Sequence, residues 1–275
     1  MFKKILFTFL AIKIFASQPE PFALFTVPKS GSHLLIKTLY YMTGFTPYWH
    51  TDPPATKQLF QQSHFPYTHC CLSPRLLNYY ANSSIKQIIG IRDLRDVAVS
   101  IVYQIRKGLW PEFTHNPRKK EEFLRLSFDE QLLFVIQQEY KLAPPEILLQ
   151  LEIQKVAKQA ELLVQNPSVF ICRYEDLVGP QGGGTSESQK QLLQKIGLHI
   201  GLYFSPEQIE ELSLCCYGNE YNPFGHGDFS NYQSTFREGK IGSWRNSFKE
   251  VHKEAFKKKL GRALITLGYE KDDTW

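Results

Sequence analysis

The feature that most constrains the fold is an apolar run followed directly by a short polar turn and a stretch of helical periodicity. Residues 22–27, Phe-Ala-Leu-Phe-Thr-Val, have the length and composition of a buried β-strand. A proline ends that run, and residues 29–32, Lys-Ser-Gly-Ser, form a small polar turn. Apolar residues then recur at helical spacing over residues 35–42, and Gly44 is a suitable C-cap. The sequence therefore predicts a strand, a tight turn and a helix in that order.

A turn of this kind brings a helix N-terminus to the carboxyl edge of a sheet. Backbone N–H groups and the helix dipole favour an anion such as phosphate there. Lys29 adds a cation, and Ser30 and Ser32 add hydroxyl donors. The turn is not a Walker A loop, because the glycine of that motif precedes the lysine, whereas Gly31 follows Lys29. Taken alone, the stretch is equally compatible with an ordinary strand–helix turn that carries a surface lysine.

A second strand and helix are expected over residues 85–106. Residues 88–91, Ile-Ile-Gly-Ile, have the composition of a buried strand, and Arg92 stands at its end. A helix follows, with Ser100 two turns inside it. A guanidinium fork at the strand exit and a hydroxyl on the helix can both reach one phosphate. The alternative is that Arg92 simply pairs with Asp96.

A third segment, near the C-terminus, combines glycines with basic residues. Residues 236–246 read Phe-Arg-Glu-Gly-Lys-Ile-Gly-Ser-Trp-Arg-Asn, with two glycines three positions apart. A loop of this composition can wrap a phosphate with its backbone amides. The alternative is a solvated basic loop, which is what most charge runs are.

Together and in this order, these segments resemble the nucleotide-binding signature of sulfotransferases that use 3′-phosphoadenosine 5′-phosphosulfate (PAPS). The first resembles the family's 5′-phosphosulfate loop, PKSGT[TS]W, and the second its 3′-phosphate motif, R-[DN]-P-[KR]-D-V-x-x-S. The third resembles the RKGxxGxW[KR]N segment, and a fourth matches a YEDL stretch whose tyrosine lies against the adenine. The matching segments are residues 28–32, 92–100, 236–246 and 173–177. The resemblance spans residues 22–267.

The resemblance implies which residues hold the nucleotide. The 5′-phosphate would be held by Lys29, Ser30, Gly31, Ser32, His33 and Leu34. The 3′-phosphate would be held by Arg92, Ser100, Arg237 and Gly239, and Tyr174 would lie against the adenine. The implied reaction transfers a sulfuryl group from PAPS, the co-substrate, to a hydroxyl or amine and leaves adenosine 3′,5′-bisphosphate. No metal is needed.

The resemblance also implies two catalytic residues. Lys29 would steady the charge that develops on the bridging oxygen of the leaving group. Residues 63–66, Ser-His-Phe-Pro, resemble the family's [ST]H[LF]P segment, whose histidine acts as the base, and this assigns the role to His64. A histidine with a near-neutral pKa can take the proton of an acceptor hydroxyl. His69, five residues on, is the alternative by its spacing to Arg92.

The chain departs from the family pattern at several positions. Ser32 replaces a threonine, and Leu34 stands where tryptophan is common. Glu238 replaces the lysine of RKG, so it either weakens the 3′-phosphate contact or points outward while the backbone of Gly239 binds. Gln62 stands where many relatives have a lysine, two residues before the histidine. Glu238 and Gln62 support a rival interpretation, a non-catalytic nucleotide- or anion-binding protein that retains the fold. A nucleotide kinase is a second rival, but it would need Mg²⁺ and a Walker-type Lys-Ser pair.

The first 17 residues differ in kind from the rest. Two lysines precede a short apolar stretch that ends in small residues, as in a secretory signal peptide, and the stretch is too short for a stable membrane span. This predicts a secreted or exported protein. The alternative is an N-terminal strand or arm of a cytoplasmic enzyme. The five cysteines include two vicinal pairs and do not form a disulfide framework, and PAPS is made in the cytosol.

Composition and length set the remaining limits. In 275 residues, 43% of them hydrophobic, there is material for one substantial core. We expect a signal peptide over 1–17 and one domain over 18–275. Its fold class is α/β in three layers, with a mainly parallel central sheet flanked by helices and a P-loop-like nucleotide site. A net charge of +5 fits anionic ligands or substrates and is too small to indicate nucleic acid. The resemblance implies a small-molecule or glycan acceptor. Gly182, Gly183 and Gly184 predict a flexible loop without a phosphate role.

Overall fold

The computed structural model describes residues 18–53, 56–70, 72–110, 113, 116–137, 153–217 and 237–275. Within these residues lies a five-stranded sheet in the order β2-β3-β1-β4-β5, in which every neighbouring pair is parallel. The strands are β1 (Phe22–Thr26), β2 (Thr46–Trp49), β3 (His64–His69), β4 (Lys86–Ile91) and β5 (Val169–Arg173). The proposed signal segment lies outside the described residues.

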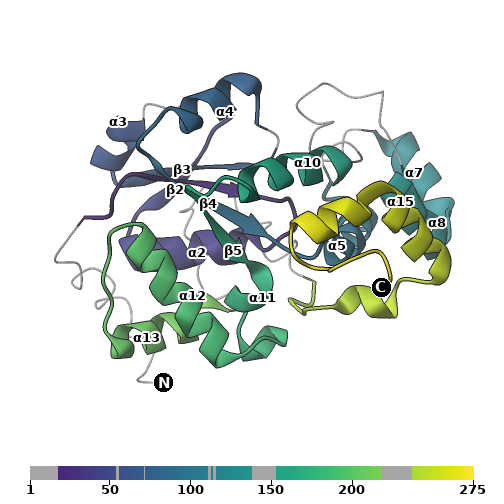
Figure 1. Cartoon of the computed structure of the whole chain (residues 1–275). Coiled ribbons are helices and arrows are strands. Elements are labelled where there is room, and N and C mark those ends of the chain that lie inside the picture. The colour runs from purple at the N-terminus through teal and green to yellow at the C-terminus, as the bar shows by residue number, and fades with distance from the viewer. Residues whose placement is uncertain are drawn as a thin grey trace.

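Helices cover both faces of the sheet (Figure 1). Those that follow the first three strands are α2 (Ser32–Thr43), α3 (Thr56–Gln61) and α4 (Pro74–Ala81). Those between β4 and β5 are α5 (Leu94–Arg106), α7 (Pro117–Arg125), α8 (Phe128–Gln137) and α10 (Ile153–Val164). After β5 come α11 (Tyr174–Leu177), η1 (Pro180–Gly182), α12 (Ser186–His199), α13 (Pro206–Cys216), η2 (Ser243–Asn246) and α15 (Glu250–Thr266).

Two apolar cores lie on the two sides of the sheet. Every residue of β1 is buried, because both of its faces are covered. Ala23 and Phe25 pack into the larger core with α4, α5, α8, α10 and α15. Phe22 and Leu24 point the other way, into the core with α2, α12 and α13. The predicted three-layer α/β fold with a parallel central sheet is therefore confirmed. No described helix is long and apolar enough to cross a bilayer.

The strand register determines where a site can form. Thr26 ends β1 and is aligned with His69, the last residue of β3, and with Gly90 of β4. Gly90 is in turn aligned with Cys172, one residue before the end of β5. The loops that leave β1, β3, β4 and β5 consequently meet at one carboxyl edge, which is where ligands bind in open α/β sheets.

Candidate nucleotide-binding site

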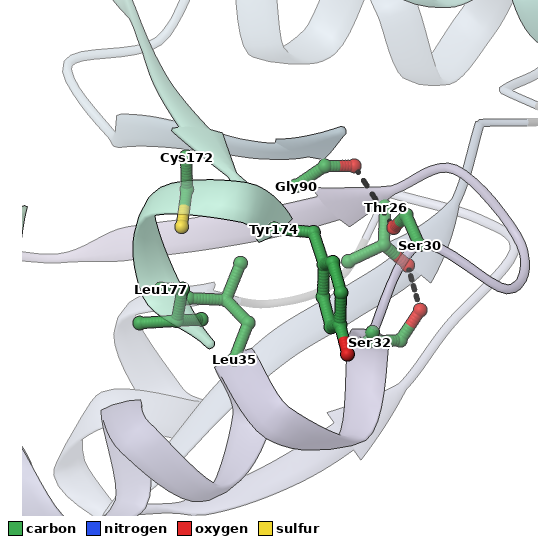
Figure 2. A pocket seen from close by; sticks show the side chains of 9 residues that line it. Thr26, Ser30, Ser32, Leu35, Gly90, Cys172, Tyr174 and Leu177 are labelled. Atoms are coloured by element: carbon green, nitrogen blue, oxygen red, sulfur yellow. Dashed lines mark hydrogen bonds between the residues drawn. The ribbon is translucent and has the colours of Figure 1, made fainter. Parts of the chain in front are cut away.

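The turn between β1 and α2 is held in a conformation that requires glycine at one position. Gly31 has a φ of +87°, and a Cβ atom added there would lie 2.4 Å from the ring of Tyr174. The tyrosine ring thus lies directly on the backbone of the turn, at the start of α2 (Figure 2). Lys29 is also left-handed, with a φ of 64°. A side chain at Gly31 would displace the ring and strain the backbone.

Hydroxyl groups fix this turn to the strands beside it. Ser30 Oγ donates to the carbonyl of Gly90 at 3.2 Å, and Ser32 Oγ donates to Thr26 Oγ1 at 2.9 Å (Figure 2). A small pocket opens beside the turn at the N-terminus of α2. It is lined by Thr26, Ser30, Gly31, Ser32, Leu35, Gly90, Cys172, Tyr174 and Leu177. The predicted strand, turn and helix thus form a small recess at the carboxyl edge.

Arg92 connects the three segments that the sequence singled out. Its Nη2 atom donates to the carbonyl of Lys240 at 2.7 Å, and its Nη1 atom lies 3.5 Å from the carbonyl of Lys29. The guanidinium stacks over Tyr174, with Cζ 4.3 Å from the ring centroid. Its Nε–H is buried and has no hydrogen-bond partner among the described residues. A buried donor without a partner is costly, and a ligand oxygen would satisfy it.

Asp96 fixes the glycine-rich segment against the start of α5. Its Oδ2 accepts a hydrogen bond from the Gly242 N–H at 2.8 Å, and its Oδ1 accepts from the Trp244 N–H at 2.8 Å and from Ser243 Oγ at 3.1 Å. Arg92 Nη2 lies 3.4 Å from Oδ2, so the anticipated Arg92–Asp96 pair also forms. Asp96 is wholly buried, and its position depends on these donors.

Arg237 lies against the face of α5 that also carries Asp96. Its Nη2 donates to Ser243 Oγ at 2.5 Å, and its guanidinium lies 4.7 Å from the ring centroid of Tyr103. Asp96, Ser100 and Tyr103 are spaced four and then three residues apart, so they share one face of the helix. Ser100 is therefore on the face of α5 toward Arg237. That Arg92, Ser100 and Arg237 hold one 3′-phosphate stays a prediction.

The segment around Gly239 is supported by a contact with the η1 turn that the sequence did not reveal. Gly182, in the η1 turn, lies against Gly239, because a Cβ at Gly182 would be 2.7 Å from the Gly239 carbonyl. The Gly182 carbonyl accepts from the Ile241 N–H at 2.9 Å, and Lys240 Nζ donates to the Gln181 carbonyl at 2.6 Å. The sequence predicts a flexible loop for the glycine run, but Gly182 packs against the segment that holds Gly239 and Ile241. The nearby αL residue Gly239 has a φ of 63°.

Lys29 lies at the same carboxyl edge. Its Nζ donates to Gln104 Oε1 of α5 at 3.1 Å. Burial and the neighbouring cations Arg92 and Lys107 lower the pKa of Lys29 to about 8. His33, the second residue of α2, has a pKa lowered to about 3 by burial and by the charges of Lys29 and His69. Leu34 is half-buried and packs against the core on the α2 side.

His64 does not lie at this edge. It is the first residue of β3 and is aligned with Thr46, the first residue of β2. Its Nδ1 is within hydrogen-bond reach of Thr46 Oγ1. The five residues from there to the end of β3 span about 16 Å of extended chain. Lys29 and His64 therefore do not converge as the Ser-His-Phe-Pro motif suggested, because that motif begins a strand here instead of ending one.

His69, the alternative, ends β3 at the carboxyl edge. Its Nδ1 is 2.8 Å from Thr26 Oγ1, and the Trp49 ring centroid lies 5.2 Å from that of the imidazole. Burial and the charge of Lys29 lower the pKa of His69 to about 4, although a hydrogen bond to the Thr26 backbone raises it. The imidazole is consequently neutral near pH 7, and Lys29 is the cation close to it.

The comparisons with known proteins agree with this geometry. A family model described as "Sulfotransferase domain" matches residues 19–268. The chain belongs to the sulfotransferase family. Among solved structures, this sulfotransferase resembles the mouse sulfotransferase SULT7A1 complexed with PAP, with a TM-score of 0.57 and 17% sequence identity. That similarity covers 90% of this chain and 87% of the mouse chain. No curated protein matches the sequence.

Proposed function

We propose that this protein transfers a sulfuryl group from PAPS to a hydroxyl or amine of an acceptor. The observation that carries the proposal is the convergence on Arg92 of the β1–α2 turn, the start of α5 and the glycine segment. Its buried Nε–H still lacks a partner among the described residues, which suits an anionic ligand. Family membership and the PAP held by the mouse relative support the same co-substrate.

The residues present fit such a nucleotide. The N-terminus of α2 would hold the 5′-phosphate. The hydroxyls of Ser30 and Ser32, which donate to Gly90 and Thr26 in the free protein, would have to turn toward the phosphate to bind it. Arg92, Ser100 and Arg237 would hold the 3′-phosphate, and the ring of Tyr174 would meet the adenine. When bound, PAPS would supply the activated sulfuryl group. As in phosphoryl transfer, the protein's contribution would be positioning and charge stabilisation.

Lys29 and His69 are the residues that we propose for catalysis. Lys29, with a pKa of about 8, is largely cationic at neutral pH and would stabilise negative charge on the leaving oxygen. His69 is neutral at that pH, and with Nδ1 on Thr26 its Nε2 would meet the acceptor hydroxyl. An anionic nucleotide beside both groups would raise their pKa values, which makes the imidazole a better base.

Trp49 indicates where the acceptor would lie. It ends β2, the strand at one edge of the described sheet, and it is 37% exposed although its ring contacts those of Tyr67 and His69. An acceptor that brought a hydroxyl to His69 from this side would lay its body against the indole. Flat apolar faces stack well on such a ring. We therefore propose a small-molecule or glycan acceptor whose hydroxyl is borne on or beside a ring.

Two measurements test the proposal. Calorimetry should show that adenosine 3′,5′-bisphosphate binds much more tightly than AMP, which lacks the 3′-phosphate. Transfer of labelled sulfur from PAPS should then be measured on a panel of linear alcohols, phenols and glycosides. Trp49→Ala should lower kcat/KM for ring-bearing acceptors about 10-fold and leave linear alcohols unaffected, as expected for one lost aromatic contact. Bisphosphate binding without transfer to any acceptor would favour the non-catalytic binder.

A further inference from the structure

The guanidinium of Arg237 has an acidic neighbour inside the predicted 3′-phosphate site. Glu238 Oε2 lies 3.6 Å from Arg237 Nη2, the same atom that donates to Ser243. The Arg237 side chain is only 17% exposed, and its stacking on Tyr103 fixes its plane. Glu238 is 53% exposed, so it approaches the guanidinium from the solvent side. The acid therefore faces the cation instead of pointing away from the site.

This placement sets a carboxylate against any phosphate that uses Arg237. A phosphate monoester carries nearly two negative charges at pH 7, and it would compete with Glu238 for the same guanidinium. The two anions would also repel each other over a distance shorter than the Debye length. The Ser30 and Ser32 hydroxyls and the N-terminus of α2 belong to a different loop, and no contact of the Glu238 side chain with them is present among the described residues. Glu238 should therefore weaken the binding of the 3′-phosphate and leave that of the 5′-phosphate unchanged.

We infer that Glu238 sets the affinity and selectivity for the 3′-phosphate, by occupying Arg237 in the free protein and repelling the phosphate in the complex. The inference rests on the proposed function, since it assumes that Arg237 contacts this group. Its consequence is a site that binds the bisphosphate product more weakly than the two arginines alone would allow. Weaker product binding shortens the time before the product leaves, a step that limits turnover in many enzymes.

The test compares charge variants at this position with a matched control. Glu238→Gln removes the charge and keeps the shape, whereas Glu238→Lys reverses the charge. Glu210→Gln is the control, because Glu210 on α13 is also 53% exposed and pairs with a lysine, Lys190. The dissociation constants of adenosine 3′,5′-bisphosphate and AMP are measured by calorimetry for each full-length variant, at low and at high ionic strength.

The expected result is selective and has a fixed sign. Glu238→Gln should bind the bisphosphate about 3- to 10-fold more tightly and AMP equally well, which is the range for a partly screened charge pair. Glu238→Lys should gain more, Glu210→Gln should gain nothing, and high salt should shrink the gains. Unchanged or weaker bisphosphate binding by Glu238→Gln would overturn the inference. If the unmodified protein itself does not prefer the bisphosphate to AMP, the proposed function fails instead.

Discussion

Asp96→Asn offers the sharpest test of how the site is held together. The substitution keeps the volume of the side chain, but an amide NH₂ group replaces one carboxylate oxygen. If the amide oxygen keeps the Trp244 N–H and the Ser243 hydroxyl, the new NH₂ faces the Gly242 N–H, which now donates at 2.8 Å. It also faces the Arg92 guanidinium, which lies 3.4 Å from the present carboxylate. Donor then meets donor at both contacts.

The size of the effect follows from these contacts. A donor left unsatisfied in a buried position costs about 1–3 kcal/mol, and the lost charge-assisted contact with Arg92 adds about 1 kcal/mol. We therefore expect Asp96→Asn to lower the free energy of unfolding by about 2–4 kcal/mol. With a urea m-value of about 3 kcal/mol per M for a chain of this size, the midpoint should fall by about 1 M.

Urea unfolding followed by tryptophan fluorescence measures this midpoint, and calorimetry on the same variant measures bisphosphate affinity. Asp129→Asn is the control, since it neutralises an exposed aspartate that pairs with Lys249 and should leave the midpoint almost unchanged. A midpoint for Asp96→Asn within about 0.2 M of the unmodified protein, together with unaltered bisphosphate affinity, would refute the view that Asp96 organises the loop.

Three further predictions concern the turn and the two residues that we propose for catalysis. Gly31→Ala should lose at least about 10-fold in bisphosphate affinity, whereas Gly44→Ala, with a similar φ of 71° but nothing within 4 Å of the added Cβ, should bind normally. His69→Ala should lower turnover by about 10²-fold or more at nearly unchanged nucleotide affinity, and His64→Ala should remain active; the opposite pattern would return the role to His64. Bisphosphate affinity should fall as pH rises from 7 to 9, because Lys29 loses its proton near pH 8, and Lys29→Arg should flatten that profile if the lysine is responsible.

The sequence predicted the position of site residues correctly where those residues directly follow a buried strand. The turn at Lys29–Ser32 and the arginine at residue 92 each follow a buried strand directly, so local pattern alone placed them at the carboxyl edge. The glycine segment over residues 236–246 was left open by its own residues, and its assignment rested on the resemblance to the family motif. None of these cases required knowledge of which strands pair.

The histidines show where that reasoning fails. Residues 45–67 contain prolines and aromatic residues without a steady period, a pattern that is typical of loops, yet β2 and most of β3 form there. Pro66 lies inside β3, but the register with β1 begins one residue later, at Tyr67, so its missing N–H breaks no pair on that side. Only the strand register shows that His64 and His69 stand at opposite ends of one strand. The contact of Gly182 with Gly239 is equally nonlocal.

The bonds of Asp96 also fix an order of events during synthesis. Its partner Gly242 lies 146 residues further along the chain. At the usual rate of translation, on the order of 10 s passes between the two residues. During that interval the β1–α2 and β4–α5 units can form. The Asp96 carboxylate and Arg92 still lack their partners in the glycine segment, because that segment has not been synthesised. In a growing chain of this protein the proposed 3′-phosphate site is therefore incomplete until the C-terminal segment docks, so a nucleotide that needs the whole site cannot assist the earlier steps of folding.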